Sequence, residues 1–252
     1  ARGSGEKPQG DPDPSWSGVW SEGLGSRVTP VLNGLQLELE AQNSDAAQSI
    51  KVLSVRYRAL GVGNNPLRMV SSNDPSYLDS IYDGVNQTIT LIKTENNRCR
   101  AQGQKIVLSG YSQGALAIHI ALRKLQATDP TQLETIAGVA LISDPAKTPF
   151  GSEDLLEEYN KWAGTGINNA QGIWSMYMAG ADDGPLPGGV TSRTISMCRN
   201  HDPVCAPPLG PDSLLGRGVF GMRIHTDDYY KTHSDVLGRW VADKYLGVKF
   251  IL

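Results

Sequence analysis

Four short apolar runs, separated by segments with helical periodicity, constrain the fold of this chain more than any other feature. Each run is nearly continuous in apolar residues, which is typical of strands buried on both faces. The runs are IKVLSV (50–55), KIVLS (105–109), IAGVALI (136–142) and RTISM (193–197).

Three other segments have apolar residues at spacings of three and four, which predicts amphipathic helices. These segments are 78–92, 118–125 and 236–245. Strands that alternate with helices predict a parallel sheet with helices on both of its faces. We therefore expect an α/β fold, a three-layer α/β/α sandwich around a central, mostly parallel sheet.

The length and charge of the chain limit its class. Its 252 residues are enough for one large domain with a proper core, so we expect a single domain over 1–252. The net charge is −3 and no basic block stands out, which argues against a nucleic-acid binder or an anionic-membrane binder. No apolar run approaches the roughly 20 residues that a membrane-spanning helix needs.

Residues 149–191 interrupt the alternation between two predicted strands. They contain a predicted acidic amphipathic helix (SEDLLEEYNKWAG), an aromatic and methionine cluster (IWSMYMAG) and a glycine- and proline-rich loop (DDGPLPGG). Connections of this length are usually functional or mobile. We expect a lid-like insertion that covers a substrate site; the alternative is that it packs a second small core. The side chains expected to contact substrate are Trp162, Trp174, Met176 and Met178.

The stretch CRNHDPVC (198–205) contains two of the three cysteines. A metal site would need more ligands nearby than this stretch offers. A disulfide between Cys198 and Cys205 that closes a short polar loop fits better, and it indicates an oxidising compartment.

The sequence VLSGYSQGALAIHIAL places a G-x-S-x-G motif between a predicted strand and a predicted helix. In this context the serine occupies a sharp, strained turn, and side chains at the two glycine positions would clash. The N-terminus of the helix offers amide groups to a developing oxyanion. Ser112 is therefore a candidate nucleophile; the alternative is an ordinary turn with an exposed serine.

A serine nucleophile needs a base and an acid, in the chain order serine, acid, histidine for this architecture. Asp202 follows a predicted strand inside the cysteine loop, and Asp144 follows another strand in LISDP. Either could be a turn residue before proline. We favour Asp202, because a disulfide would hold its loop in place.

Four histidines are candidates for the base. His119 lies inside the helix after the nucleophile, and His201 precedes the acid, so neither fits the expected order. His225 and His233 both follow the acid. His233 lies at the start of the last predicted helix, where a capping role is common, so we favour His225.

With these residues assembled, the chain resembles the cutinase family of serine esterases, compact relatives of the α/β-hydrolases, over nearly its whole length. GYSQG matches the family's nucleophile at Ser112, and CRNHDPVC matches its disulfide loop with the catalytic aspartate at Asp202. ARGSGE matches the exit of the family's first strand, and VRYRA matches a later segment. The resemblance also favours His225 over His233. The insertion at 149–191 is absent from the short members.

The resemblance implies an oxyanion hole built from Ser4 and from the amide of Gln113. It implies a secreted or cell-wall-associated carboxylic-ester hydrolase that needs no metal and no organic cofactor. The expected substrate is an ester with an apolar acyl chain, such as cutin, a polyester or a lipid, with transient contact to a lipid or polymer surface; we expect a monomer. Two alternatives stay open: an acetylxylan-type carbohydrate esterase, and a catalytically silent cell-wall or lipid-binding module.

The third cysteine, Cys99, lies just before the nucleophile strand, where the family has a cysteine bonded to one ahead of its first strand. That upstream strand is not in this sequence, which begins at ARGSGE. Since secreted proteins rarely leave one cysteine unpaired, we expect the sequence to be a fragment of a longer chain.

Overall fold

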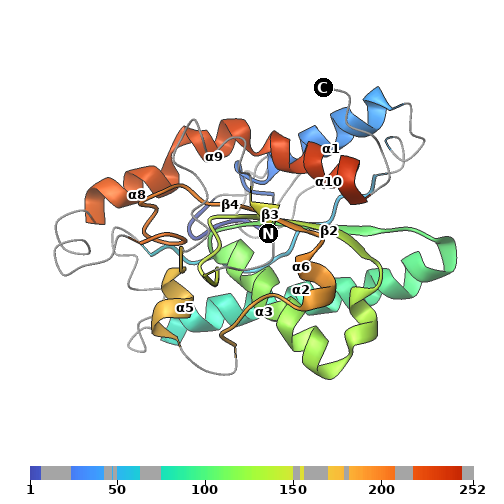
Figure 1. Ribbon diagram of the computed structural model, residues 1–252. Coiled ribbons are helices and arrows are strands. Elements are labelled where there is room, and N and C mark those ends of the chain that lie inside the picture. The colour runs from blue at the N-terminus through green and yellow to red at the C-terminus, as the bar shows by residue number, and fades with distance from the viewer. Residues whose placement is uncertain are drawn as a thin grey trace.

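A four-stranded parallel sheet forms the centre of the computed structural model (Figure 1). The structure describes residues 1–6, 24–42, 47, 50–62, 75–149, 154–155, 170–178, 182–207 and 218–245. In spatial order the strands are β1 (Ile106–Tyr111), β2 (Ile136–Ile142), β4 (Thr194–Met197) and β3 (Asp154–Leu155). All three neighbouring pairs run parallel.

Helices cover both faces of this sheet. On one side lie α2 and α3, and on the other lie α1, α9 and α10 (Figure 1). The helices are α1 (Thr29–Ala41), α2 (Pro75–Gln102), α3 (Gln113–Thr128), the 3-10 helix η3 (Pro130–Leu133), α5 (Ile173–Tyr177), α6 (Gly188–Thr191), α8 (Gly218–Thr226), α9 (Asp228–His233) and α10 (Asp235–Tyr245). The predicted three-layer α/β/α sandwich is confirmed.

The central strand β2 shows why the sequence folds this way. All seven of its residues are buried, as its uninterrupted apolar run predicts for a strand covered on both faces. Val139 and Leu141 join a core cluster that contains residues of α2 and α3. Ala140 and Ile142 point the other way, into a cluster with residues of α1 and α10. The alternation of side chains along one strand therefore builds two cores.

The predicted strand at 50–55 is wrong, because the structure assigns no strand within 50–62. Leu53 is 40% exposed, so the apolar run is not buried on both faces. Carbonyl groups further along this segment bond to the N-terminal residues: Tyr57 accepts from the guanidinium of Arg2, and Ala59 accepts from the N–H of Gly5.

Parts of the predicted insertion belong to the sheet and the core. Asp154–Leu155 pair with β4, so the acidic helix expected there is wrong for these two residues. Trp174 is only 1% exposed and packs with residues of α2 and α3, so the expected substrate contact is also wrong. For Trp174 the alternative, core packing, holds. Met176 and Met178 are half-buried, and Trp162 lies outside the described residues.

The loop that follows is attached to α2 and α3. The hydroxyl of Tyr82 donates to Asp182 Oδ2 (2.7 Å), and Lys124 lies 3.6 Å from the other oxygen of this carboxylate. The hydroxyl of Ser175 donates to the neighbouring Asp183 (2.9 Å). These contacts fix the described end of the insertion on the helical layer.

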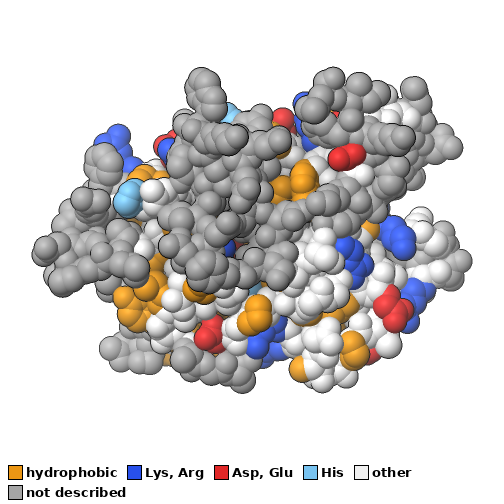
Figure 2. Space-filling model, in the orientation of Figure 1, with side chains coloured by type: hydrophobic (Ala, Val, Ile, Leu, Met, Phe, Trp, Pro, Cys, Tyr) orange, Lys and Arg blue, Asp and Glu red, His pale blue; other side chains and the backbone are white. Residues whose placement is uncertain are grey.

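Charged side chains of both signs are interspersed over the described part of the face in Figure 2, consistent with the small net charge. Among the described residues, no helix is both long and apolar enough to span a membrane.

Two glycines allow α1 and α10 to pack backbone against backbone. A Cβ on Gly34 would lie 1.9 Å from the carbonyl oxygen of Asp235, and one on Gly238 would lie 1.9 Å from that of Val31. No rotamer change relieves a clash with a main-chain oxygen, so any side chain here must separate the helices.

We expect Gly238→Ala to lower the free energy of unfolding by about 1–3 kcal/mol, because the added methyl overpacks this contact. Gly189→Ala is the matched control, since its Cβ would meet nothing within 4 Å. Urea unfolding of both variants checks this. Equal stability of the two variants would show that the helices accommodate the methyl freely.

Candidate active site

Ser112 lies at a sharp turn between β1 and α3. Its φ of 52° and ψ of −119° place it in a region that strains any residue with a side chain. Its N–H donates to the carbonyl of Ile142 at the end of β2 (2.8 Å), which ties the turn to the next strand. Its Oγ lies 2.9 Å from Nε2 of His225, close enough to transfer a proton.

The two glycines of the motif are required because the chain is crowded around Ser112. A Cβ on Gly110 would lie 2.7 Å from backbone atoms of Gly114 and Ala115. A Cβ on Gly114 would lie 2.4 Å from the carbonyl oxygen of Ala1. Either side chain would force the turn apart, so the G-x-S-x-G spacing has a steric cause.

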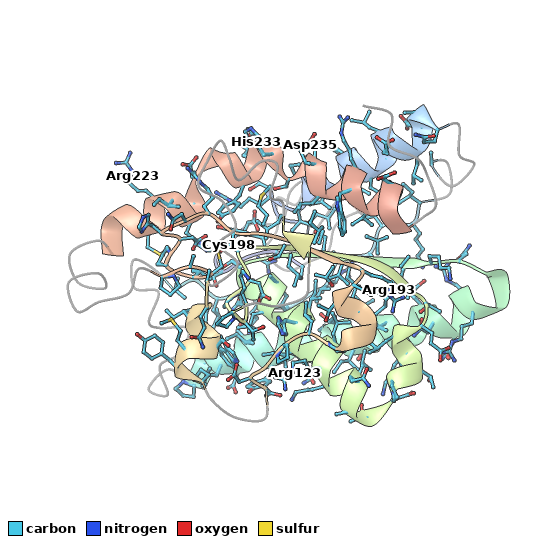
Figure 3. All side chains as sticks on the ribbon, viewed as in Figure 1. Arg123, Arg193, Cys198, Arg223, His233 and Asp235 are labelled. Carbon is cyan, nitrogen blue, oxygen red and sulfur yellow. A yellow bond between two sulfur atoms is a disulfide. The ribbon has the colours of Figure 1, made fainter. Side chains whose placement is uncertain are left out.

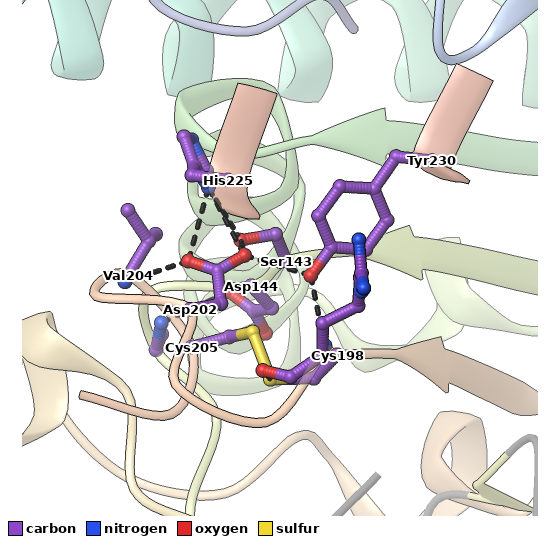
Figure 4. Close-up of a disulfide and its surroundings, with 10 residues drawn as sticks. Ser143, Asp144, Cys198, Asp202, Val204, Cys205, His225 and Tyr230 are labelled. Carbon is purple, nitrogen blue, oxygen red and sulfur yellow. Dashed lines mark hydrogen bonds and ion pairs between the residues drawn. A yellow bond between two sulfur atoms is a disulfide. The ribbon is translucent and has the colours of Figure 1, made fainter. Parts of the chain in front are cut away.

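Asp202 lies in the loop closed by the Cys198–Cys205 disulfide, which the structure contains. The carboxylate is fully buried, and each of its oxygens accepts hydrogen bonds. Oδ1 accepts from the N–H of Val204 (2.8 Å), and Oδ2 accepts from the hydroxyl of Tyr230 (2.7 Å) (Figure 4). A buried carboxylate needs such donors, because they replace the hydrogen bonds to water that it loses on burial.

The electrostatic balance keeps Asp202 ionised. Burial alone would raise the pKa of the Asp202 carboxyl, but the neighbouring charge of His225 and the hydrogen bonds from His225, Tyr230 and Val204 outweigh burial and lower it. Burial raises the pKa of the Tyr230 phenol well above its usual value, and the charge of Asp202 adds to this. Tyr230 therefore stays protonated and remains a donor.

His225 lies near the end of α8 and connects Asp202 to Ser112. Its Nδ1 is 3.1 Å from both oxygens of Asp202, while Nε2 faces Ser112. Tyr111 holds the ring from one side: the two rings stack with centroids 5.2 Å apart, and the Tyr111 hydroxyl donates to the carbonyl of His225 (2.6 Å). With Nδ1–H directed at a carboxylate, Nε2 is left able to accept the serine proton.

Asp144, the rival acid, belongs to a second buried pair. Its Oδ2 lies 2.6 Å from Nδ1 of His119, and its Oδ1 accepts from the N–H of Ala146 (2.9 Å). The other ring nitrogen of His119 lies 3.0 Å from the carbonyl oxygen of Gly184. Both ring nitrogens of His119 thus face acceptors, so this pair has no nitrogen available for a serine.

The two remaining histidines lie away from this arrangement. His233 ends α9 and projects outward from the helical layer (Figure 3), with Nδ1 2.8 Å from the hydroxyl of Thr232. His201 is exposed in the disulfide loop with a φ of 64°. The structure therefore brings together Ser112, Asp202 and His225.

Of the residues expected in the oxyanion hole, Gln113 follows Ser112 directly, and the N-terminal segment that contains Ser4 passes close to Ser112 at Gly3. A Cβ on Gly3 would lie 3.4 Å from that of Ser112, so the N-terminal segment passes beside the serine. The hydroxyl of Ser4, next in the chain, lies 2.5 Å from the phenol of Tyr77 on α2. Gln113 opens α3 and is fully buried, and the helix does not use the N–H groups of its first turn.

Sequence reasoning missed three residues that contact the site: Tyr111, Ser143 and Tyr230. Tyr111 and Ser143 each lie at the carboxyl end of a parallel strand, where sites in such sheets form, so their position was a usable signal. Tyr230 gave no such signal, because its contact with Asp202 spans 28 residues and depends on how α9 docks. The described residues contain no group of three or more side chains arranged to hold a metal ion.

The chain is similar to known proteins. Residues 23–215 match the family model Cutinase. Cutinase CUT1 of Coprinopsis cinerea is 28% identical over 114 residues, which is 45% of this chain and 38% of that protein. Probable carboxylesterase Culp3 of Mycobacterium tuberculosis is 27% identical over 169 residues, which is 64% of this chain and 49% of that protein. The chain thus spans less than half the length of these curated relatives.

A solved structure of a cutinase-like protein from Cryptococcus sp. shares the fold. It superposes with a TM-score of 0.61 at 18% identity, over 98% of this chain and 92% of that one. The family match covers well over half of the sequence and includes the turn at Ser112 and the loop that holds Asp202. This chain belongs to the Cutinase family.

Proposed function

We propose that this protein hydrolyses carboxylic esters, with Ser112 as the nucleophile, His225 as the base and Asp202 as the orienting acid. The observation that carries the proposal is the continuous line of contacts from Ser112 Oγ through the His225 ring to the buried Asp202 carboxylate. Membership of the Cutinase family supports the same reaction class.

The geometry accounts for each step. Ser112 Oγ attacks the ester carbonyl while Nε2 of His225 takes its proton, and Asp202 stabilises the resulting imidazolium. The amide of Gln113 and the Ser4 residue stabilise the oxyanion of the tetrahedral intermediate. His225 returns the proton to the departing alcohol, which leaves an acyl group on Ser112. Water, activated by the same histidine, then releases the acid and restores the serine.

The proposed substrate is an ester with an apolar acyl chain. Met178 packs against a buried apolar cluster that includes Tyr77 and Val204. Tyr77 contacts Ser4, and the N–H of Val204 holds Asp202, so this cluster adjoins both sides of the site. The disulfide beside Asp202 supports a proposed location outside reducing compartments.

Ser112→Ala should abolish ester hydrolysis and labelling by a fluorophosphonate probe, because it removes the hydroxyl that forms the acyl-enzyme. The fold should be retained, as judged by circular dichroism, since only one oxygen atom is removed. Assays with para-nitrophenyl butyrate and palmitate measure the activity. A wild-type protein that hydrolyses neither ester and takes up no probe would favour the silent binding module.

Asp202→Asn should lower kcat about 10⁴-fold, since the amide favours the wrong imidazole tautomer. Asp144→Asn is the matched control, because it changes the other buried His–Asp pair in the same way. It should leave kcat near the wild-type value and lower the free energy of unfolding by about 1–3 kcal/mol. A severe kcat loss in Asp144→Asn with a mild one in Asp202→Asn would reverse the assignment of the acid.

Met178→Ala should reduce kcat/KM for the palmitoyl ester more than for the butyryl ester, because it removes apolar surface next to the site. The neighbouring Tyr177 is 48% exposed, so Tyr177→Ala should leave the ratio of the two rates unchanged. An unchanged ratio in a folded Met178→Ala variant would place the acyl chain elsewhere.

A further inference from the structure

Ser143 follows β2 directly and is fully buried beside the proposed triad. Its φ is 51°, in the left-handed region that favours glycine over any residue with a side chain. Its N–H donates to the carbonyl of Met197 at the end of β4 (2.7 Å), which holds the backbone in this conformation. Strained residues of this kind persist only where the surrounding structure holds them, and they are concentrated at functional sites.

The side chain of Ser143 contacts both the acid and the base. Its Oγ donates to Asp202 Oδ2 (2.7 Å) and lies 3.0 Å from Nδ1 of His225 (Figure 4). A hydroxyl has one proton and two lone pairs. Because the proton is directed at Asp202, a lone pair remains to accept from the N–H of His225. One hydroxyl can therefore serve both partners at once.

We propose that Ser143 is a positioning residue that fixes the relative orientation of the Asp202 carboxylate and the His225 ring. This inference rests on the proposed function and deepens it. Val204 and Tyr230 each donate a hydrogen bond to one oxygen of Asp202. Ser143 contacts both groups, so it determines how Nδ1 faces the carboxylate and hence how Nε2 faces Ser112.

The backbone strain separates this role from a structural one. Glycine adopts a positive φ without strain, so Ser143→Gly removes the hydroxyl and relieves the backbone together. A purely structural residue would leave Ser143→Gly as active as the wild type. If Ser143 is a positioning residue, Ser143→Gly should be at least as stable as Ser143→Ala and should still have a lower kcat than the wild type.

The test compares Ser143→Gly and Ser143→Ala in kcat and KM for para-nitrophenyl butyrate and in urea unfolding. We expect kcat to fall roughly tenfold or more in both variants, the loss expected for a hydrogen bond to a charged group. KM should stay unchanged, since the proposed role involves the triad and not the acyl chain. In the Asp202→Asn background, Ser143→Gly should cost little further, because the hydroxyl acts through that carboxylate.

Ser80→Ala is the control for loss of a buried hydroxyl elsewhere. Its Oγ accepts from the N–H of Leu60, so this variant should lose stability but keep its kcat. A wild-type kcat in Ser143→Gly would overturn the inference, and so would an equal further loss in the Asp202→Asn background. If Ser112→Ala is inactive while Ser143→Gly is fully active, only this inference fails. If Ser112→Ala keeps its activity, both the proposed function and this inference fail.

Discussion

The buried negative charge of Asp202 is the constraint around which the candidate site is organised. A carboxylate with no contact to water must be surrounded by donors, and these come from different parts of the chain. Val204 belongs to the same disulfide loop, Ser143 follows β2, His225 lies on α8 and Tyr230 lies on α9. Each segment therefore has to dock correctly before the charge is satisfied, and the satisfied charge in turn fixes their relative positions.

The end of β2 lies between two His–Asp pairs, which differ in what the second ring nitrogen of each histidine faces. Adjacent residues there face opposite sides: Ser143 contacts Asp202 and His225, while Asp144 contacts His119 on α3. His119 has acceptors at both ring nitrogens and ties α3 to the loop at Gly184. In His225, the nitrogen that faces away from the aspartate, Nε2, meets the hydroxyl of Ser112 instead of a carbonyl oxygen. The same residue types thus stabilise the fold in one pair and create a site able to take up a proton in the other.

Much of this site could be predicted from the sequence, because its signals are local. The turn at Ser112 follows from glycine spacing, and the short loop around Asp202 is bounded by cysteines. The errors arose where burial depends on distant segments. The run at 50–55 has a strand's composition but leaves Leu53 exposed, and the acidic pattern around Asp154 supplies an edge strand instead of a helix.

Side-chain partners were the least predictable part. Trp174 lies in an aromatic and methionine cluster that resembles a substrate-binding surface, yet its side chain packs in a core with residues of α2 and α3. The position of Ser143 after a strand was a usable signal that it lies near the site, but its partner Asp202 is 59 residues away and no local pattern identifies that pair. Tyr230 contacts Asp202 across 28 residues and gave no local signal at all. Periodicity identifies which face of an element is apolar, but it does not identify what that face meets.

The close packing of α1 on α10 has a consequence for how the protein folds. These helices come from opposite ends of the described chain, and together they cover one face of the sheet, where Ala140 and Ile142 lie. Contacts between residues so distant in sequence require the closure of a very long loop, which is slow. During synthesis that face would stay uncovered until α10 emerged, so the nascent chain would expose an apolar sheet surface that a chaperone could bind.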